Sequence, residues 1–527
     1  METIDGLFRR LDQLNDIGAS LSNERNLNRL LEKILLAAKA ITQADGGTLY
    51  RLSEDRRRLH FEIVRTDSLN LAFGGSVAES VSGKFPDLHL YQPDGTPNNT
   101  LVAAYAALTG QTVNIADAYQ AEGFDFSGTR KFDQHTGYRS QSFLTVPMTN
   151  HEGEIIGVLQ LINATSPTGE VVEFSQADQS LAESLASQAA IALTNRQLVQ
   201  QLETLFESFI QLINLAIDEK SPYTGGHCQR VPELTMMLAE AVNATKEGPL
   251  ADFELTDKDR YELRIAALMH DCGKVTTPVH VVDKATKLQT IYDRIHLIDT
   301  RFEVLRRDAE VVMWRNVANG QGKAEAEATY QAFCQKIEVD RSILRHSNIG
   351  GEKMKDEDIA HVKRIAQEYR WRNPAGEEVS FLDDNELENL TIRAGTLTAP
   401  ERETINHHIV ATIKMLEQLP WPKHLKNVTE YAGGHHERMD GKGYPKGLKR
   451  EEMSWQARMM GIADIFEALT AKDRPYKEGM KLSQALGILE NFKNNGHIDP
   501  DLHAIFVKDE IYRKYAVNFL GAGQIDC

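Results

Sequence analysis

The sequence predicts a multidomain chain, in which an α+β domain with an antiparallel sheet and flanking helices precedes an all-α domain. Short apolar segments of strand length, separated by polar turns, occur in residues 1–195. Residues from about 180 to 220 have the pattern of one long helix, and amphipathic helical patterns continue through residues 205–527. At 527 residues, the chain is long enough to form two or more separate cores.

The composition argues against two classes of partner, long nucleic acid and anionic membranes. Apolar residues make up 41% of the chain and charged residues 26%, which are ordinary values for a globular protein. The formal net charge of −17 argues against binding to long nucleic acid or to an anionic membrane, since both require basic surfaces. The sequence shows no apolar run of membrane-span length, no signal-peptide start and no disulfide-like cysteine spacing. We therefore expect a cytoplasmic protein.

The first domain is predicted from one helix and a set of strands. Residues 27–41 have apolar side chains at helical spacing. Ser175 and Asp178 have the spacing of a capping box that opens a second, longer helix. The expected strands are residues 47–52, 59–64, 142–148 and 155–163.

The long helix that follows carries an apolar stripe. Its residues alternate by four and three positions, which is the spacing of a coiled-coil seam. The spacing predicts a homodimer joined through a parallel helical stalk, and the alternative is that the stripe packs on the following domain. The residues of the stripe are Leu198, Leu202, Leu205, Phe209, Leu212 and Ala216.

Histidines and acids in five separated segments of the second domain predict a two-metal hydrolytic site. His435 and His436 are adjacent, so they cannot both face one core, and a metal gives both rings a function. Asp271 follows His270 at the end of an apolar helix, and its carboxylate can bridge two cations. Asp464 lies among apolar neighbours and requires a partner. The predicted ligands are His227, His270, Asp271, His408, His435, His436 and Asp464.

These ligands, together with Lys274 and the sequence Gly443-Tyr444-Pro445, resemble the HD-GYP branch of the HD-domain phosphohydrolases. The resemblance covers residues 205–527 and implies hydrolysis of cyclic di-GMP to linear pGpG, to GMP, or to both. It implies two divalent metal ions with Asp271 as the bridge. One metal would take His227, His270, Asp271 and Asp464, and the other would take Asp271, His408, His435 and His436. Iron or manganese is expected, and zinc or nickel also suits such ligands.

The resemblance also assigns roles to residues around the metals. Lys274 would stabilise or protonate the departing ribose oxygen. Arg474 and Lys477 would hold phosphate, although an exposed basic helix face is the alternative. The turn that contains Tyr444 would shape the rim of the pocket and offer a contact to diguanylate cyclase (GGDEF) proteins.

Two positions depart from the family pattern. Tyr223 stands where some relatives carry a glutamate ligand, so we expect two metals and not three. Ser221 replaces an aspartate found in many relatives, which would loosen a contact to substrate or metal. These departures leave two alternatives to cyclic di-GMP hydrolysis. One is a cyclic dinucleotide receptor with negligible turnover, and the other is a hydrolase of a different cyclic dinucleotide.

The first domain resembles a GAF domain, with the strand GVLQLIN at residues 157–163, which implies a sensor of a small ligand. Asn163 is followed by Ala164, which departs from the cyclic-nucleotide pattern, so the ligand is unknown. A dimerisation module without a ligand is the alternative.

In the second domain, residues 285–395 are expected to form a helical insertion. Three aromatic side chains are candidates for a small core within it: Trp314, Phe333 and Trp371.

Overall fold

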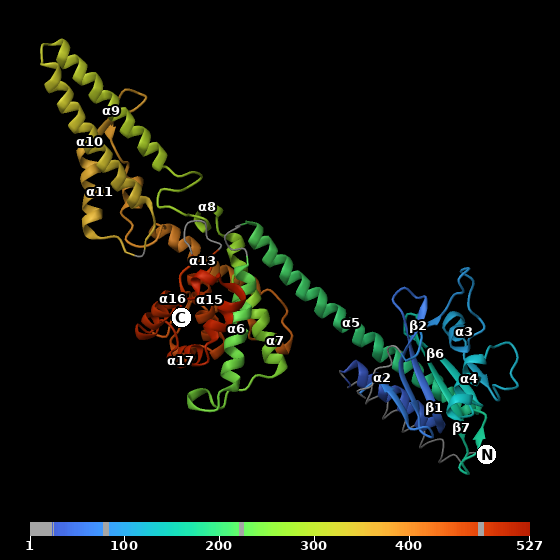
Figure 1. Cartoon of the computed structure of the whole chain (residues 1–527). Helices are drawn as coiled ribbons and strands as arrows, with labels where there is room; N and C mark the ends of the chain where they lie inside the picture. The colour runs from blue at the N-terminus through green and yellow to red at the C-terminus, as the bar shows by residue number, and fades with distance from the viewer. Residues whose placement is uncertain (1–23, 25, 77–83, 221–225, 352, 473–478) are drawn as a thin grey trace. The chain divides into compact units, whose positions relative to one another are not determined.

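The computed structural model describes residues 24, 26–76, 84–220, 226–351, 353–472 and 479–527. The chain divides into two compact units, residues 1–206 and 207–527. Helix α5 (Gln176–Lys220) supplies its first part to one unit and its last part to the other (Figure 1). Within the described residues, no helix has the length and apolar character needed to cross a membrane.

The first unit is built on an antiparallel sheet with the strand order β3-β2-β1-β7-β6-β5, to which β4 adds beside β2 and β8 beside β7. The four expected strands are confirmed as β1, β2, β6 and β7. The others are two to four residues long, too short to show alternation in the sequence. The strands are β1 (Ala44–Leu52), β2 (Arg58–Thr66), β3 (Leu71–Gly74), β4 (Leu88–His89), β5 (Val113–Ile115), β6 (Phe143–Thr149), β7 (Ile155–Thr165) and β8 (Val171–Val172).

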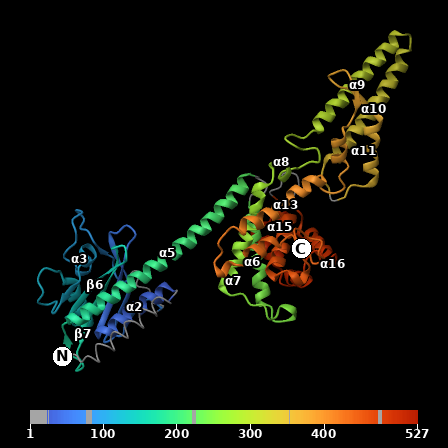
Figure 2. The same ribbon diagram turned by 180° about the vertical axis from the view of Figure 1, so that it is seen from behind.

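Helices cover both faces of this sheet (Figures 1 and 2). Helix α2 (Leu27–Thr42) and the first part of α5 share one core with β1, β6 and β7, while α3 (Val102–Thr109) packs on the opposite face. Helix α4 (Ser127–Thr136) completes the unit. The predicted capping box is confirmed, since the Ser175 backbone N–H donates to Asp178 Oδ2 at 3.0 Å and the Asp178 N–H donates to Ser175 Oγ at 3.2 Å.

The second unit is mostly helical, as predicted. Capping boxes at Thr256 and Thr398 fix the starts of α7 and α13. The α-helices outside the insertion are α6 (His227–Ala244), α7 (Asp257–Met269), α8 (Val279–Val282), α13 (Ala399–Leu416), α14 (Val428–Gly433), α15 (Trp455–Thr470), α16 (Leu482–Asn494), α17 (Pro500–Lys508) and α18 (Ile511–Phe519). The 3-10 helices are η1 (Gly248–Leu250), η2 (Cys272–Thr276), η3 (Lys423–Leu425), η4 (Arg450–Glu452) and η5 (Ala522–Gln524).

The insertion forms a core of its own, which includes Phe302, Leu344 and Phe381. Helices α9 and α10 lie side by side in both views (Figures 1 and 2). Most of the insertion is helical, and a turn with Gly376 at a φ of 84° closes a two-stranded hairpin within it. Its elements are α9 (Ile295–Ala318), α10 (Lys323–Asn348), α11 (Asp356–Glu368), β9 (Arg370–Arg372), β10 (Glu378–Ser380) and α12 (Asp384–Leu390).

The aromatic residues expected in the core of the insertion behave differently from one another. Phe333 and Trp371 pack against the core, as predicted. Trp314 does not, since it lies in the last turns of α9 and remains 50% exposed. Composition alone could not separate these cases, because all three residues are apolar but only two face the neighbouring helices.

A buried lysine ties the insertion to the start of α13. The ammonium group of Lys284 lies 2.6 Å from Glu401 Oε2 and 2.8 Å from Asn389 Oδ1. Glu401 belongs to the capping box of α13, and Asn389 lies in α12. Because Lys284 is only 3% exposed, solvent screens this ion pair weakly.

We expect the substitution Lys284→Met to lower the free energy of unfolding by about 1–3 kcal/mol, because Glu401 and Asn389 lose a buried charged donor. Urea unfolding followed by circular dichroism measures this change. The control is Lys363→Met, which removes an exposed lysine from α11 and should leave the unfolding midpoint unchanged. Equal midpoints for both variants would contradict a stabilising role for Lys284.

Candidate metal centre

The structure brings the seven predicted ligands together in two groups. His227, His270, Asp271 and Asp464 each offer one ligand atom, and these atoms lie within 4.8 Å of one another. His408, His435 and His436 form the second group, within the same limit. The side chains come from the start of α6, the junction of α7 and η2, the middle of α13, the segment after α14, and α15.

The first group is tightly packed. Nε2 of His227 lies 3.1 Å from Asp271 Oδ2 and 3.3 Å from Asp464 Oδ1. Nε2 of His270 lies 3.1 Å from the same Asp271 oxygen and 3.3 Å from His227 Nε2. Four nitrogen and oxygen ligand atoms therefore converge in a buried space. Mixed imidazole and carboxylate ligands of this kind suit a first-row divalent metal.

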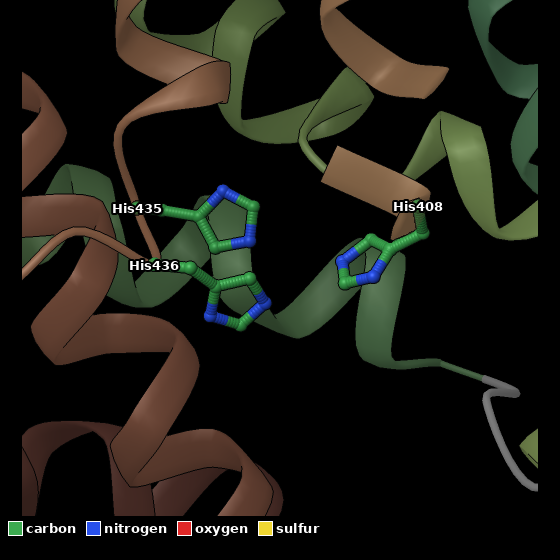
Figure 3. Close-up of side chains that lie close together, drawn as sticks. All are labelled: His408, His435 and His436. Carbon is green, nitrogen blue, oxygen red and sulfur yellow. The ribbon is translucent and has the colours of Figure 1, made fainter. Parts of the chain in front are cut away.

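The second group consists of three imidazole rings. Figure 3 shows His435 and His436, which leave the chain at adjacent positions, opposite His408 from α13. Nε2 of His408 lies 3.2 Å from Asp271 Oδ1. Asp271 therefore directs one carboxylate oxygen to each group, which is the geometry expected of a bridging ligand.

The hydrogen bonding of three buried atoms shows whether these residues suit a pair of metal ions. Asp271 Oδ1, His408 Nε2 and His435 Nε2 have no hydrogen-bond partner among the described residues. The 3.2 Å approach of His408 to Asp271 is close enough for a hydrogen bond but does not have the required alignment. Buried polar atoms are nearly always paired, so these three atoms fit a role as ligands to cations.

The backbone fixes the orientation of three of the imidazoles. Nδ1 of His270 lies 2.7 Å from the carbonyl oxygen of Ala267, and Nδ1 of His435 lies 2.6 Å from that of Ala432. Nδ1 of His408 contacts the carbonyl oxygen of Ile405 in the same way. An Nδ1–H that donates to a carbonyl leaves the Nε2 lone pair free for a metal.

Glu467 performs the same task for His227, and sequence reasoning missed it. Its Oε2 lies 2.5 Å from His227 Nδ1, while Arg230 Nε donates to its Oε1 at 2.7 Å. Burial favours a raised pKa for this carboxyl, but His227 and Arg230 outweigh burial and lower the pKa to about 2. A signal was present in the sequence, since Glu467 follows Asp464 by one helical turn in the apolar stretch 459–469.

The electrostatics of His435, His436 and Asp271 favour the forms that bind metals. Burial lowers the pKa of His435 well below its usual range and that of His436 to about 4, so both rings are neutral at pH 7. Burial opposes ionisation of Asp271, but Lys274 and His270 hold the pKa of Asp271 well below its usual range. Neutral imidazole and ionised carboxylate are the ligand forms that metal binding requires. Burial opposes protonation of His227, but Glu467, Asp271 and Asp464 raise its pKa well above the usual range, so this ring must lose a proton to bind a metal.

Lys274 lies directly beside the bridging carboxylate, with its Nζ 2.6 Å from Asp271 Oδ2. Burial favours a lowered pKa for the ammonium, but Asp271 and Asp464 outweigh burial and raise the pKa. The side chain therefore holds a proton next to the proposed metal pair.

The Gly-Tyr-Pro turn borders the second group, and the ring of Tyr444 stacks on His436 with centroids 4.8 Å apart. A Cβ atom at Gly443 would lie 2.4 Å from the Arg438 backbone nitrogen, so only glycine fits there. Glu437, which sequence reasoning missed, accepts backbone N–H bonds from Lys446 at 2.7 Å and Leu448 at 2.9 Å. This carboxylate holds the turn beside the metal ligands.

Other predicted residues have different outcomes. Ser221, Tyr223, Arg474 and Lys477 lie outside the described residues, so their expected roles stay predictions. His408 is buried, whereas the neighbouring His407 is exposed, which agrees with the choice of His408 as the ligand.

Comparisons with known proteins agree with this arrangement. The family model described as a GAF domain matches residues 26–193. Two family models described as HD domains match residues 224–315 and 338–502. The chain joins a GAF domain to an HD domain.

Two bacterial phosphodiesterases are similar to part of this chain. A cyclic di-GMP phosphodiesterase of Pseudomonas aeruginosa is 38% identical over 116 residues, which cover 22% of this chain and 27% of the relative. A 3'3'-cGAMP-specific phosphodiesterase of Vibrio cholerae is 36% identical over 116 residues, which cover 22% of this chain and 24% of the relative. The matched region thus spans about a quarter of each relative. The crystal structure of the GAF domain of an Acinetobacter phosphoenolpyruvate-protein phosphotransferase aligns with 37% of this chain and 98% of its own, at 20% identity and a TM-score of 0.27.

Gly273 of the HD domain lies against α13, and we expect Gly273→Ala to disrupt metal binding. A Cβ atom there would lie 2.0 Å from the His408 carbonyl oxygen and 2.6 Å from the Thr412 backbone nitrogen, so α13 must move. Overpacking of this kind costs about 1–3 kcal/mol. Metal content per chain should fall below that of the wild type, as measured by inductively coupled plasma mass spectrometry.

The control for this test is Gly487→Ala in α16, where an added Cβ atom would meet nothing within 4 Å. This variant should bind as much metal as the wild type. A Gly273→Ala variant that also retains its metal would contradict a role of the contact between η2 and α13 in metal binding.

Proposed function

We propose that the protein is an HD-GYP phosphodiesterase that hydrolyses cyclic di-GMP to linear pGpG, to GMP, or to both. The observation that carries this proposal is the position of Asp271, whose two carboxylate oxygens face two separate groups of imidazoles. A buried carboxylate in this position supports a site for two cations about one bridging ligand.

Two divalent cations held by these residues would supply an activated water and positive charge for the phosphate oxygens. The residues of the chain add further functions. Lys274 holds a proton at Nζ beside Asp271 and would donate it to the departing ribose oxygen. Tyr444 borders the site and offers a ring for contact with a base. Arg474 and Lys477 would hold the second phosphate.

The metals that we propose are iron or manganese, with zinc or nickel as alternatives. Five of the seven ligands are imidazoles, which suit all four metals, and the two carboxylates favour the harder ions among them. The cytoplasm is the proposed location. The buried free thiols of Cys228 and Cys272 are compatible with its reducing conditions.

A second candidate function is hydrolysis of 3'3'-cGAMP. The support for it is the similarity to a Vibrio cholerae enzyme of that specificity, which matches this chain nearly as well as the cyclic di-GMP enzyme does. A receptor role with negligible turnover is the remaining alternative, suggested by Ser221 in place of the aspartate of many relatives.

The GAF domain is proposed to control the HD domain in response to a small ligand. Helix α5 begins in the GAF domain and ends in the second unit, four residues before the HD match begins, so it provides a continuous connection. Diguanylate cyclase proteins are proposed as partners of the turn that contains Tyr444.

We expect manganese-loaded or anaerobically iron-loaded protein to release pGpG or GMP from cyclic di-GMP. The variant Asp271→Ala should lower the turnover by at least about 100-fold, because both cations lose their bridge. Chromatography of the products measures this rate, and Asp252→Ala, at an exposed position, serves as the control.

Parallel assays with 3'3'-cGAMP separate the two substrates. Binding of either nucleotide without any product would favour the receptor alternative. Equal turnover by the wild type and Asp271→Ala would overturn the proposed hydrolase.

The exposed stripe on α5 supports the proposed homodimer, since its leucine and phenylalanine side chains remain 47–65% exposed. We expect Leu202→Glu to place a charge in the seam and to shift the protein from dimer to monomer in light scattering. The control Gln200→Glu adds the same charge on the outer face of the helix and should leave the dimer intact. A wild-type protein that is monomeric at micromolar concentration would rule out this seam.

A further inference from the structure

The last turns of α5 are fixed within the second unit. Ile210, Asn214 and Ile217 are 1%, 7% and 2% exposed, and their spacing of four and three places them on one face of the helix. This buried face differs from the exposed stripe that includes Leu212. The end of α5 therefore has a defined position against the HD domain, and Lys220 is its last residue.

Lys220 contacts the 3-10 helix that carries the site lysine. Its ammonium group donates to the carbonyl oxygen of Lys274 at 3.4 Å and to the carbonyl oxygen of Val275. Both carbonyls lie at the C-terminal end of η2 (Cys272–Thr276). The last carbonyls of a helix have few partners and attract cations, so a lysine stabilises this end.

The opposite side of η2 is held by α13. The Gly273 backbone N–H donates to Thr412 Oγ1 at 2.9 Å, and Gly273 leaves no room for a Cβ atom against the His408 carbonyl. Asp271 lies at the N-cap of η2, and the Lys274 N–H donates to its carbonyl at 2.9 Å. This short helix therefore lies between a fixed contact to α13 and the side chain of Lys220.

We propose that Lys220 is a positioning residue, through which the end of α5 holds η2 where Lys274 reaches Asp271. Helix α5 is continuous from the GAF domain, so a rotation or shift of this helix would reach the site through the Lys220 side chain. This inference adds a route of regulation to the proposed phosphodiesterase and rests on that function for its kinetic test. Lys220 itself lies outside both ligand groups, so its effect would be on the placement of Lys274.

The test uses the full-length protein and the variants Lys220→Met and Lys220→Arg. Lys220→Met keeps the aliphatic stem but removes the charged donor, so kcat for cyclic di-GMP should fall about tenfold while KM stays within about twofold. Lys220→Arg should recover most of kcat, because a guanidinium group can donate to the same carbonyls. The control is Lys258→Met, at an exposed position in α7, which should match the wild type.

Hydrogen exchange of the segment 270–278 gives a readout that does not depend on turnover. Amide exchange in this segment should be faster in Lys220→Met than in the wild type, with the same metal content. Unchanged exchange would overturn the inference, and so would metal loss with an unchanged kcat per bound metal. If the wild type does not hydrolyse cyclic di-GMP, the proposed function fails, and the exchange experiment alone decides whether Lys220 positions η2.

Discussion

The carboxylate of Asp271 is the constraint on which the rest of the HD domain depends. It is 2% exposed, and it lies within 3.2 Å of three imidazole nitrogens and one ammonium nitrogen. A buried carboxylate is costly unless cations or donors surround it. Helices α6, α7 and α13 and the 3-10 helix η2 bring those groups to Asp271. Helix α15 adds the second carboxylate of the site, Asp464.

Precision in this centre comes from groups one step away from the ligands. Backbone carbonyls three residues upstream hold His270, His408 and His435, and Glu467 holds His227. None of these contacts adds a further ligand to the metal site, and each one fixes which ring nitrogen of the histidine faces the site. The close approach of Gly273 to α13 then sets the distance between the two groups.

The sequence predicted the features that depend on local patterns. The capping box at Ser175, the four longer strands and the apolar stripe of α5 each depend on residues close together in the sequence, and the seven ligands carry a family motif. Glu467 and Arg230 were missed because their partners lie 240 and 237 residues away in the sequence, and the spacing of Asp464 and Glu467 does not identify those partners. Glu437 was missed because its partners are backbone N–H groups of an irregular turn, which no side-chain pattern marks. The prediction that Trp314 lies in the core of the insertion was wrong for a related reason. The position of an aromatic residue along its helix, and not its type, decides whether it faces a neighbouring element.

The insertion in the HD domain is attached in a way that leaves the following helix, α13, largely independent of it. The insertion has a hydrophobic core of its own. Three of the residues that hold the start of α13 lie outside residues 285–395: Lys284, Thr398 and Glu401. Asn389 is the contribution of the insertion to that junction. A change in the length of this insertion would therefore leave in place most of the contacts that hold the start of the helix that carries His408.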